Sequence, residues 1–412
     1  MKRGSIFPGA LVFSLLHICA GCSNPEPGKN DLDTASGKGN SYYQDTATRM
    51  VTKSAPEWAE MLKHDTGWIG ADGIYCMPMN GVEAPGKMKE TNTFFWFSDC
   101  IIGNIVADTL QKDWEMLHNS VAFMKGDKVD PGNIKFFWRK DSAGHAISMF
   151  EPHTPNSKPG DYYWLGDGFF DHAIDSTMYI FAYRIKNIPG GIYPFDDVGL
   201  SIIAIPKGSR PPFLNQRQYD VPFFLKDSNG KGKVVFGISV LSNTAAAGAP
   251  HPDGYIYIYG VRGEKKELLV GRILAGSFEK FNEWKFWDGT AWNNDINSAA
   301  ALTDGISNEM SVSLMEDGRV MATYQLKGNS PDVVIQVGKS PEGPFQPLKK
   351  VWSTPEIFDG IDFYTYNAKA HPHLSKPGEL LISYNVNSFN FLEDIVKHPY
   401  HLRPRFITVK YK

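Results

Sequence analysis

A strand pattern recurs five times along the chain, and each recurrence begins at a small polar cluster marked by Gly, Asn or Asp. The recurrences begin at GADGIYCMPM, GDGFFDHA, VVFGISVLSN, NEMSVSLMEDG and YNAKAHPHLS, and each is followed by a second strand-like run. Repetition at intervals of several tens of residues is typical of radial or solenoid folds, and four-stranded units indicate a propeller. A propeller gathers its innermost strands around one central hole, so residues distant in sequence can share a pocket.

The strand signals are short runs rich in Val, Ile, Tyr, Phe and Trp, bounded by Gly, Pro, Asn or Asp. They predict an all-β fold, a five-bladed β-propeller with four-stranded antiparallel blades over residues 46–412. The predicted strands are 73–79, 93–99, 119–125 and 134–139; 164–171, 177–185, 199–206 and 219–225; 233–241, 254–261, 267–274 and 284–287; 310–315, 319–325, 333–338 and 349–352; and 367–374, 379–386 and 405–411.

The fifth blade in this assignment has only three strands. An unpaired last strand would expose backbone donors and acceptors, so we expect residues 49–56 from the other end of the chain to complete it. Helical periodicity is confined to two segments, TRMVTKSAPEWAEMLK and ADTLQKDWEML, which are the helix candidates.

The N-terminal segment has the features of an export signal. Lys2 and Arg3 precede an apolar run over 6–18, and small residues stand before Cys22. This resembles a bacterial lipoprotein signal, which predicts cleavage after residue 21 and acylation of the Cys22 thiol. The alternative is an ordinary secretory signal that is cut nearby.

The polar stretch over 22–45 predicts a flexible tether, because its Gly, Pro and Ser content disfavours a packed core. The apolar run is too short to span a bilayer. We therefore expect the protein in the bacterial cell envelope, held at the outer membrane by its lipid anchor alone, on the periplasmic or the outer side.

The composition excludes several classes of function. The formal net charge is −3 without a basic stripe, which argues against a nucleic-acid partner. The sequence contains no zinc-ligand spacing, EF-hand loop, phosphate loop, dinucleotide fingerprint or nucleophile elbow, so no metal or cofactor is expected. Cys76 and Cys100 fall on neighbouring predicted strands, where they either form a cross-strand disulfide or remain buried thiols.

Three carboxylates stand directly before or within predicted inner strands. Asp72 lies between Ala71 and Gly73, Asp167 lies in a similar Gly-Asp-Gly setting one blade later, and Glu309 precedes the fourth inner strand. Glycosidic cleavage needs a carboxylic acid that protonates the departing oxygen and a carboxylate that attacks the sugar or activates water. We therefore predict Asp72 as base or nucleophile, Glu309 as general acid and Asp167 as a modulating or positioning group. The alternative interpretation of each Asp is structural: a turn residue whose side chain forms a hydrogen bond with its own backbone.

Six further residues are candidates for substrate binding, and each also has a structural interpretation. Asp99 could cap its strand, Trp164 could be core rather than a stacking platform, and Arg184 could belong to a salt bridge. The six candidates are Asp99, His118, Asn119, Trp164, Arg184 and His371.

Six blocks in this order resemble a known family: WIGADGIYCMPMNG, FFWFSDCIIG, HNSVAF, YYWLGDGFF, NEMSVSLMEDGR and YNAKAHPHLSKPGELLISYNVN. They are similar to the five-bladed propellers of the domain of unknown function 4185, some of which are grouped as glycoside hydrolase family 183, endo-acting on D-arabinan. The resemblance implies a carbohydrate-active propeller in which Asp72 and Asp167 match acidic positions. Cys76 and Cys100 depart from that pattern.

The leading hypothesis is thus a lipid-anchored glycoside hydrolase that acts on a polysaccharide, with arabinan as a candidate substrate. A second hypothesis is a surface lipoprotein that binds glycans without cleaving them and uses the same pocket. A third, a structural or protein-interaction propeller, predicts that Asp72, Asp167 and Glu309 do not converge.

Overall fold

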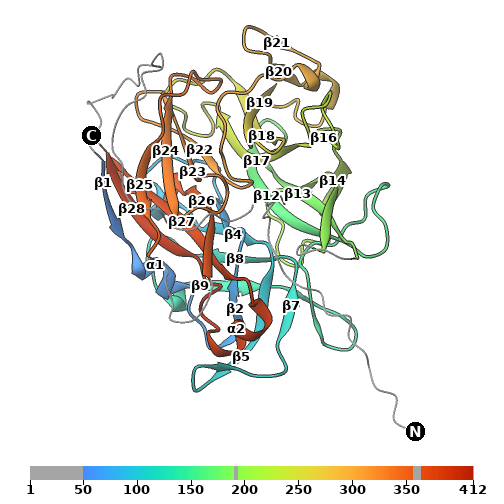
Figure 1. Ribbon diagram of the computed structural model, residues 1–412, viewed down its shortest axis with the longest axis vertical. Coiled ribbons are helices and arrows are strands. Elements are labelled where there is room, and N and C mark those ends of the chain that lie inside the picture. The colour runs from blue at the N-terminus through green and yellow to red at the C-terminus, as the bar shows by residue number, and fades with distance from the viewer. Residues whose placement is uncertain (1–49, 190–193, 356–362, 412) are drawn as a thin grey trace, which may run out of the picture.

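The computed structural model describes residues 50–189, 194–355 and 363–411, and over these ranges the chain is all-β with mostly antiparallel sheets (Figure 1). The predicted signal, the tether and Cys22 lie outside the described residues. Among the residues described, no helix is long and apolar enough to cross a membrane.

Five antiparallel sheets follow one another along the described chain, and we number them by their order. The first contains β3 (Tyr75–Pro78), β4 (Thr93–Phe97), β8 (Ser120–Met124) and β9 (Ile134–Phe137). The second contains β12 (Asp161–Asp171), β13 (Thr177–Asn187), β14 (Phe195–Ile205) and β15 (Arg217–Asp220).

The third sheet has six strands rather than the four predicted. It contains β16 (Phe224–Leu225), β17 (Val234–Asn243), β18 (Tyr255–Arg262), β19 (Glu267–Leu274), β20 (Lys285–Trp287) and β21 (Trp292–Asn293). The fourth contains β22 (Ser311–Leu314), β23 (Val320–Gln325), β24 (Asp332–Gly338) and β25 (Lys349–Ser353).

The fifth sheet joins the two ends of the described chain. It contains β26 (Phe363–Ala370), β27 (Glu379–Ser388), β28 (Arg405–Tyr411) and, outermost, β1 (Met50–Ser54). β1 pairs with β28 in antiparallel register from Met50 opposite Tyr411 to Ser54 opposite Ile407. The N-terminal strand therefore completes this sheet, as the sequence predicts.

Shorter elements fill the space between the sheets. A further sheet contains β2 (Thr66–Ala71), β5 (Cys100–Val106), β6 (Thr109–Leu110) and β7 (Glu115–Leu117), and β10 (Arg139–Lys140) pairs with β11 (Ala146–Ile147). The α-helices are α1 (Pro56–Met61) and α2 (Phe391–Lys397), and the 3-10 helices are η1 (Met88–Glu90), η2 (Pro131–Asn133), η3 (Phe281–Glu283), η4 (Ile296–Ser298) and η5 (Pro372–Leu374).

Two local predictions differ from the structure, and one open alternative is decided. ADTLQKDWEML forms β6 and β7 rather than a helix, because Ala107 and Asp108 adopt positive φ and turn the chain back on itself. The strand predicted over 367–374 ends at Ala370, since Pro372 begins the 3-10 helix η5. Cys76 and Cys100 are both free and buried, so the thiol alternative holds.

One strand of each sheet lies beside one strand of the next, and we call these five strands (β3, β12, β17, β22 and β26) the inner strands. β3 contacts β12, β12 contacts β17, β17 contacts β22, and β22 contacts β26. In Figure 1 the first sheet is in the lower middle of the view, above β2 and β5, the second and third are to the right, and the fourth and fifth are to the left. This arrangement brings the starts of the repeats toward a common centre.

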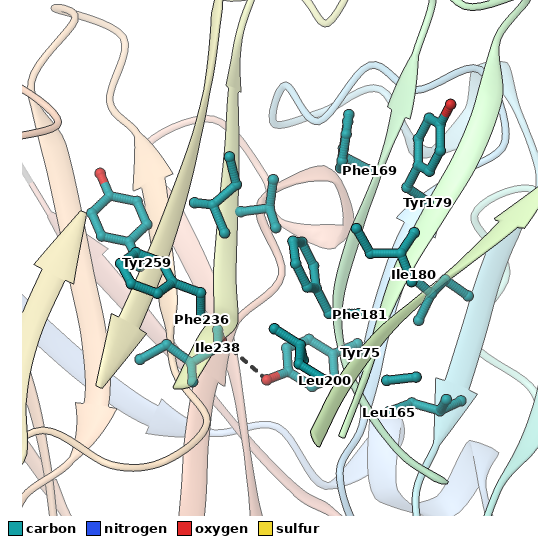
Figure 2. Packing of buried hydrophobic residues seen from close by; sticks show 14 of the residues in the cluster. Tyr75, Leu165, Phe169, Tyr179, Ile180, Phe181, Leu200, Phe236, Ile238 and Tyr259 are labelled. Atoms are coloured by element: carbon teal, nitrogen blue, oxygen red, sulfur yellow. Dashed lines mark hydrogen bonds between the residues drawn. The ribbon is translucent and has the colours of Figure 1, made fainter. Parts of the chain in front are cut away.

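The largest group of buried apolar side chains runs through the first four sheets. Figure 2 shows Phe181 of β13 facing Phe236 and Ile238 of β17. The approach is close enough to require glycine between them: Gly237 has φ +93°, and a Cβ there would lie 2.4 Å from the Phe181 ring. Positive φ and the lack of space together explain why this strand contains a glycine.

Candidate active site

Irregularities in three inner strands, β12, β17 and β26, turn polar side chains toward the centre. The pairing register shifts between Leu165 and Gly168 in β12, between Phe236 and Ser239 in β17, and between Tyr366 and Lys369 in β26. A β-bulge adds a residue to one strand and re-aims the side chains beside it. Asp167 and Lys369 each lie at one of these irregularities.

Lys369 is the central cation. Its side chain is 1% exposed and forms an ion pair with Glu309. Its ammonium also lies 4.0 Å from the centroid of the Tyr75 ring, a cation–π contact. The Tyr75 hydroxyl donates in turn to the Ile238 carbonyl at 3.1 Å. Lys369 is thus fixed between the loop that precedes β22 and the first strand β3.

Asp72 occupies the turn between β2 and β3. Gly73 takes φ +58°, and a Cβ there would lie 2.6 Å from the Ser98 hydroxyl, so the tight turn requires glycine. The Tyr366 hydroxyl donates to Asp72 Oδ2 at 2.8 Å. Burial and the negative charges of Asp99 and Glu309 raise the pKa of Asp72 well above its ordinary value, although the Tyr366 bond and Lys369 oppose the rise.

Asp167 is held by backbone donors from two strands. Its Oδ1 accepts from Gly168 N at 2.8 Å and its Oδ2 from Val240 N at 2.7 Å. Burial raises the pKa of Asp167 to about 7, against the lowering effects of these hydrogen bonds and of Lys369. A group with this pKa can exchange a proton near neutral pH.

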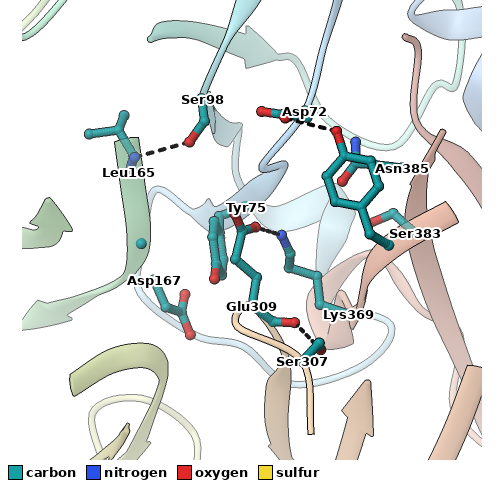
Figure 3. A network of polar contacts seen from close by, with 12 residues as sticks. Asp72, Tyr75, Ser98, Leu165, Asp167, Ser307, Glu309, Lys369, Ser383 and Asn385 are labelled. Atoms are coloured by element: carbon teal, nitrogen blue, oxygen red, sulfur yellow. Dashed lines mark hydrogen bonds and ion pairs between the residues drawn. The ribbon is translucent and has the colours of Figure 1, made fainter. Parts of the chain in front are cut away.

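The three predicted carboxylates therefore surround one lysine (Figure 3). Lys369 pairs with Glu309 and opposes the pKa rises of both Asp72 and Asp167. The structure brings together residues from the β2–β3 turn, β12, the loop before β22, and β26. Their convergence argues against the hypothesis of a purely structural propeller.

A cavity of about 230 Å³ opens beside this centre. Asp167, Lys369 and Tyr75 line it, together with Glu83 and His371. Burial and the charge of Asp167 raise the pKa of Glu83 to about 8. Asp72 and Glu309 are not among the lining residues and are 2% and 5% exposed, so they lie deeper than Asp167.

Three of the predicted binding residues lie at or beside the centre. Asp99 Oδ1 lies 2.9 Å from His118 Nδ1, within hydrogen-bond distance. The His118 ring stacks on the Tyr162 ring, with 3.7 Å between the ring centroids. His371 lines the cavity, with Nδ1 3.1 Å from Cys76 Sγ and Nε2 2.7 Å from Ser383 Oγ. Burial lowers the pKa of His371 well below its ordinary value, so the ring is neutral.

Three other candidates have mainly structural contacts. Asn119 bonds the backbone of Phe150 in both directions. Arg184 pairs with Asp220 at 2.7 Å within the second sheet. Trp164 packs edge-on against Phe195 at 4.8 Å, although its buried Nε1 has no hydrogen-bond partner among the described residues.

Sequence reasoning missed Lys369, Tyr366 and Glu83. Lys369 has a recognisable signal, because a lysine flanked by two alanines in the strand YNAKAHPH is out of place in a buried position unless it has a partner. Tyr366 has no comparable signal, since a tyrosine in a strand is most often core. Glu83 lies in a loop, GVEAPG, whose local sequence carries no such signal.

The Domain of unknown function (DUF5005) matches residues 56–411. The chain belongs to this family. No protein with a curated description matches the sequence. The more specific resemblance to the domain of unknown function 4185 remains a prediction.

Several solved structures resemble the chain. A candidate hydrolase from Bacteroides ovatus has 18% identity and a TM-score of 0.66, with 87% of this chain and 90% of that chain covered. An exo-beta-1,3-galactanase from Phanerochaete chrysosporium has 7% identity and a TM-score of 0.42, with 87% and 64% covered. The structure from Bacteroides ovatus shows a shared fold and nothing beyond it.

Proposed function

We propose that the protein is a glycoside hydrolase whose carboxylates act at the centre of a five-bladed β-propeller. The observation that carries the proposal is the convergence of Asp72, Asp167 and Glu309 on Lys369. Glycosidases need two carboxyl groups in different protonation states, and neighbouring charges and burial create such a difference. The candidate hydrolase from Bacteroides ovatus shares the fold, which supports hydrolytic chemistry here as part of the proposal.

The electrostatics favour roles opposite to those predicted from the sequence. The raised pKa of Asp72 favours the protonated form, which suits the general acid. Glu309 faces the ammonium of Lys369 as its ion-pair partner, which suits the base or nucleophile. We assign Asp167 to substrate positioning and proton balance, because it alone of the three lines the cavity.

Two hydrogen bonds support closure of the five sheets into a propeller. Tyr366 of β26 donates to Asp72, and Cys76 of β3 lies 3.1 Å from His371 Nδ1. The first contact joins the fifth sheet to the turn that leads into β3, and the second joins it to β3 of the first sheet. A closed ring would explain how the starts of all five repeats reach one centre.

We propose further that the enzyme works in the bacterial cell envelope, attached through a lipid on Cys22. In that location the substrate is a polysaccharide, and the family resemblance makes arabinan the first one to test. Metabolic labelling with a palmitate analogue tests the anchor: label should enter the wild-type protein and be absent from the Cys22→Ser variant. Label in both the wild-type protein and the variant would contradict lipid attachment at Cys22.

Binding without cleavage is the second candidate function. It is favoured by the fact that each of the three carboxylates already has a protein donor, namely Tyr366, Lys369 or backbone N–H groups. Carboxylates that already accept hydrogen bonds from the protein can shape a pocket without taking part in a reaction.

The decisive experiment screens protein lacking residues 1–22 against plant, fungal and mycobacterial glycans, including arabinans, for newly formed reducing ends. Cleavage that disappears in Glu309→Gln supports hydrolysis. Retention of one glycan by a column of the protein, with no cleavage of any, would replace hydrolysis by binding.

A further inference from the structure

The cavity beside the carboxylate centre has more acidic than basic side chains in its wall. Its charged lining residues are Glu83, Asp167, Glu316 and Lys369. Lys369 is already the ion-pair partner of Glu309, which lies outside the lining, and in Figure 3 its ammonium points to Glu309. Among the described lining residues, three carboxyl groups therefore share the cavity with one ammonium that is paired elsewhere.

Glu83 has no counter-ion among the described residues. It lies in the loop after β3, and this loop is fixed to the fifth sheet side of the cavity because Gly86 N donates to the Ser375 carbonyl at 2.8 Å. The neighbouring charge that shifts the pKa of Glu83 is Asp167, and with burial it raises this pKa to about 8. A cation beside Glu83 would have the opposite effect. The Glu83 carboxyl group thus stands at the cavity without a positive charge to balance it.

A hydroxyl without a partner lines the same cavity. Ser242 is 7% exposed, and its buried Oγ has no hydrogen-bond partner among the described residues. Ser313, which is 5% exposed, adds a second hydroxyl to the lining. Buried polar groups are nearly always hydrogen-bonded, which indicates that a polar ligand supplies the missing partner of Ser242.

We propose that this cavity binds a protonated amino sugar unit, with Glu83 and Asp167 as the counter-ions of its amine and the Ser242 hydroxyl as a partner for a ring hydroxyl. Each Asp167 oxygen accepts one backbone hydrogen bond, which leaves a further lone pair on each for the ligand. A bound ammonium lowers the pKa of both carboxyl groups, so both can ionise as the ligand enters. The apolar part of the lining suits the C–H face of a sugar ring and includes Val240, Leu241, Val312 and Leu314.

The inference rests on the proposed function and deepens it by naming the substrate class: a polysaccharide whose sugar units carry a free amine. The cavity volume of about 230 Å³ lies below the range of roughly 300–1,000 Å³ typical of ligand pockets, which suits a single unit. A neutral or N-acetylated unit leaves the carboxyl groups without a counter-ion. A neutral arabinan would then be the poorer substrate.

Calorimetric titration of the protein lacking residues 1–22 tests the site without requiring turnover. The probes are galactosamine and glucosamine, and the comparison ligands are galactose, glucose, the two N-acetylated amino sugars, ammonium and calcium ions. We expect at least one amino sugar to bind, and its neutral and N-acetylated counterparts and both inorganic cations to bind about 10-fold more weakly or less. Equal binding of a neutral or N-acetylated sugar, binding of either inorganic cation as tight as that of the amino sugar, or no binding of either amino sugar would overturn the proposal.

Variants locate the binding. Glu83→Gln should weaken amino sugar binding about 10-fold or more, because it removes a counter-ion, and Glu83→Asp should retain part of the affinity. Ser242→Ala should weaken binding several-fold. The matched control is Glu90→Gln, since Glu90 is exposed, pairs with Lys87 and lies outside the cavity lining, so the affinity should not change.

An unchanged affinity in Glu83→Gln would overturn the assignment. Amino sugar binding by a protein that cleaves no glycan would retain this site and remove hydrolysis. Cleavage of a neutral glycan by a protein that binds no amino sugar would retain hydrolysis and remove this site.

Discussion

Two buried cation–carboxylate clusters in this molecule differ in how their charges are arranged. In the second sheet Arg184 pairs with Asp220 at 2.7 Å, lies 3.5 Å from Asp161, and donates to Thr154. At the centre Lys369 pairs with Glu309, and Asp72 and Asp167 lie around it. The first cluster ties β12, β13 and β15 of a single sheet together, whereas the second joins elements of different sheets.

The protonation of the two clusters separates them further. At the centre one ammonium faces three carboxyl groups, and the pKa values of Asp72 and Asp167 are both raised. Burying carboxyl groups whose pKa values are raised lowers the stability of the folded protein, so a cluster with a structural role alone gains nothing from it. Acid–base catalysis, in contrast, needs carboxyl groups with raised pKa values. The comparison teaches that buried charge is common to both clusters, whereas raised carboxyl pKa values and a position between sheets distinguish the centre.

The largest effect should come from removing the acid groups at the centre. Asp72→Asn and Glu309→Gln should each lower kcat on a cleaved glycan by about 10²–10⁴, the usual range for a lost general acid or base. The control is Asp161→Asn in the Arg184 cluster, which is equally buried and should leave kcat unchanged. If Asp161→Asn lost kcat and the two central variants did not, the Arg184 cluster rather than the centre would contain the reactive groups.

Lys369→Met should leave Glu309 buried without a counter-ion. Loss of one partner of a buried ion pair costs about 3–5 kcal/mol of unfolding free energy, which urea denaturation can measure. The double variant Lys369→Met with Glu309→Gln should recover much of this loss, since the unpaired charge is gone. If the single variant were as stable as the wild type, the central pair would not be a buried ion pair in solution.

Arg184→Met should lower stability by about 3 kcal/mol for the same reason. It should leave the kcat of the folded protein unchanged, because the Arg184 contacts are structural. Parallel denaturation and kinetic measurements separate the two quantities. A kcat loss as large as that of Asp72→Asn would give Arg184 a role in the reaction.

A further effect, spread over several pH units, is a dependence of stability on pH. Asp167 has a folded pKa of about 7 against an ordinary value of 3.8, so the folded state binds the proton more tightly than the unfolded state. Unfolding free energy should therefore fall as pH rises from about 4 to about 7, and the fall should be shallower in Asp167→Asn. The Asp161→Asn variant is the control, and an identical slope in wild type and Asp167→Asn would refute the prediction.

Much of the fold follows from sequence because strand pattern and turn residues are local. The Ala71-Asp72-Gly73 turn and the pairing of β1 with β28 are both predictable, the latter from the missing fourth strand. The role of Lys369 is not, since its orientation depends on the register shift after Tyr366, which only tertiary pairing determines. The protonation of Asp72 likewise depends on Asp99 and Glu309, which converge only in the folded chain.

The pairing of Met50–Ser54 with Arg405–Tyr411 has a consequence for biosynthesis. The first of these strands leaves the ribosome long before its partner, because the other four sheets are made between them. Until Arg405–Tyr411 has been made, Met50–Ser54 has no strand to pair with, so the fifth sheet acquires its outer strand late. Pairing between segments so distant in sequence carries a large loop-closure cost, which slows folding.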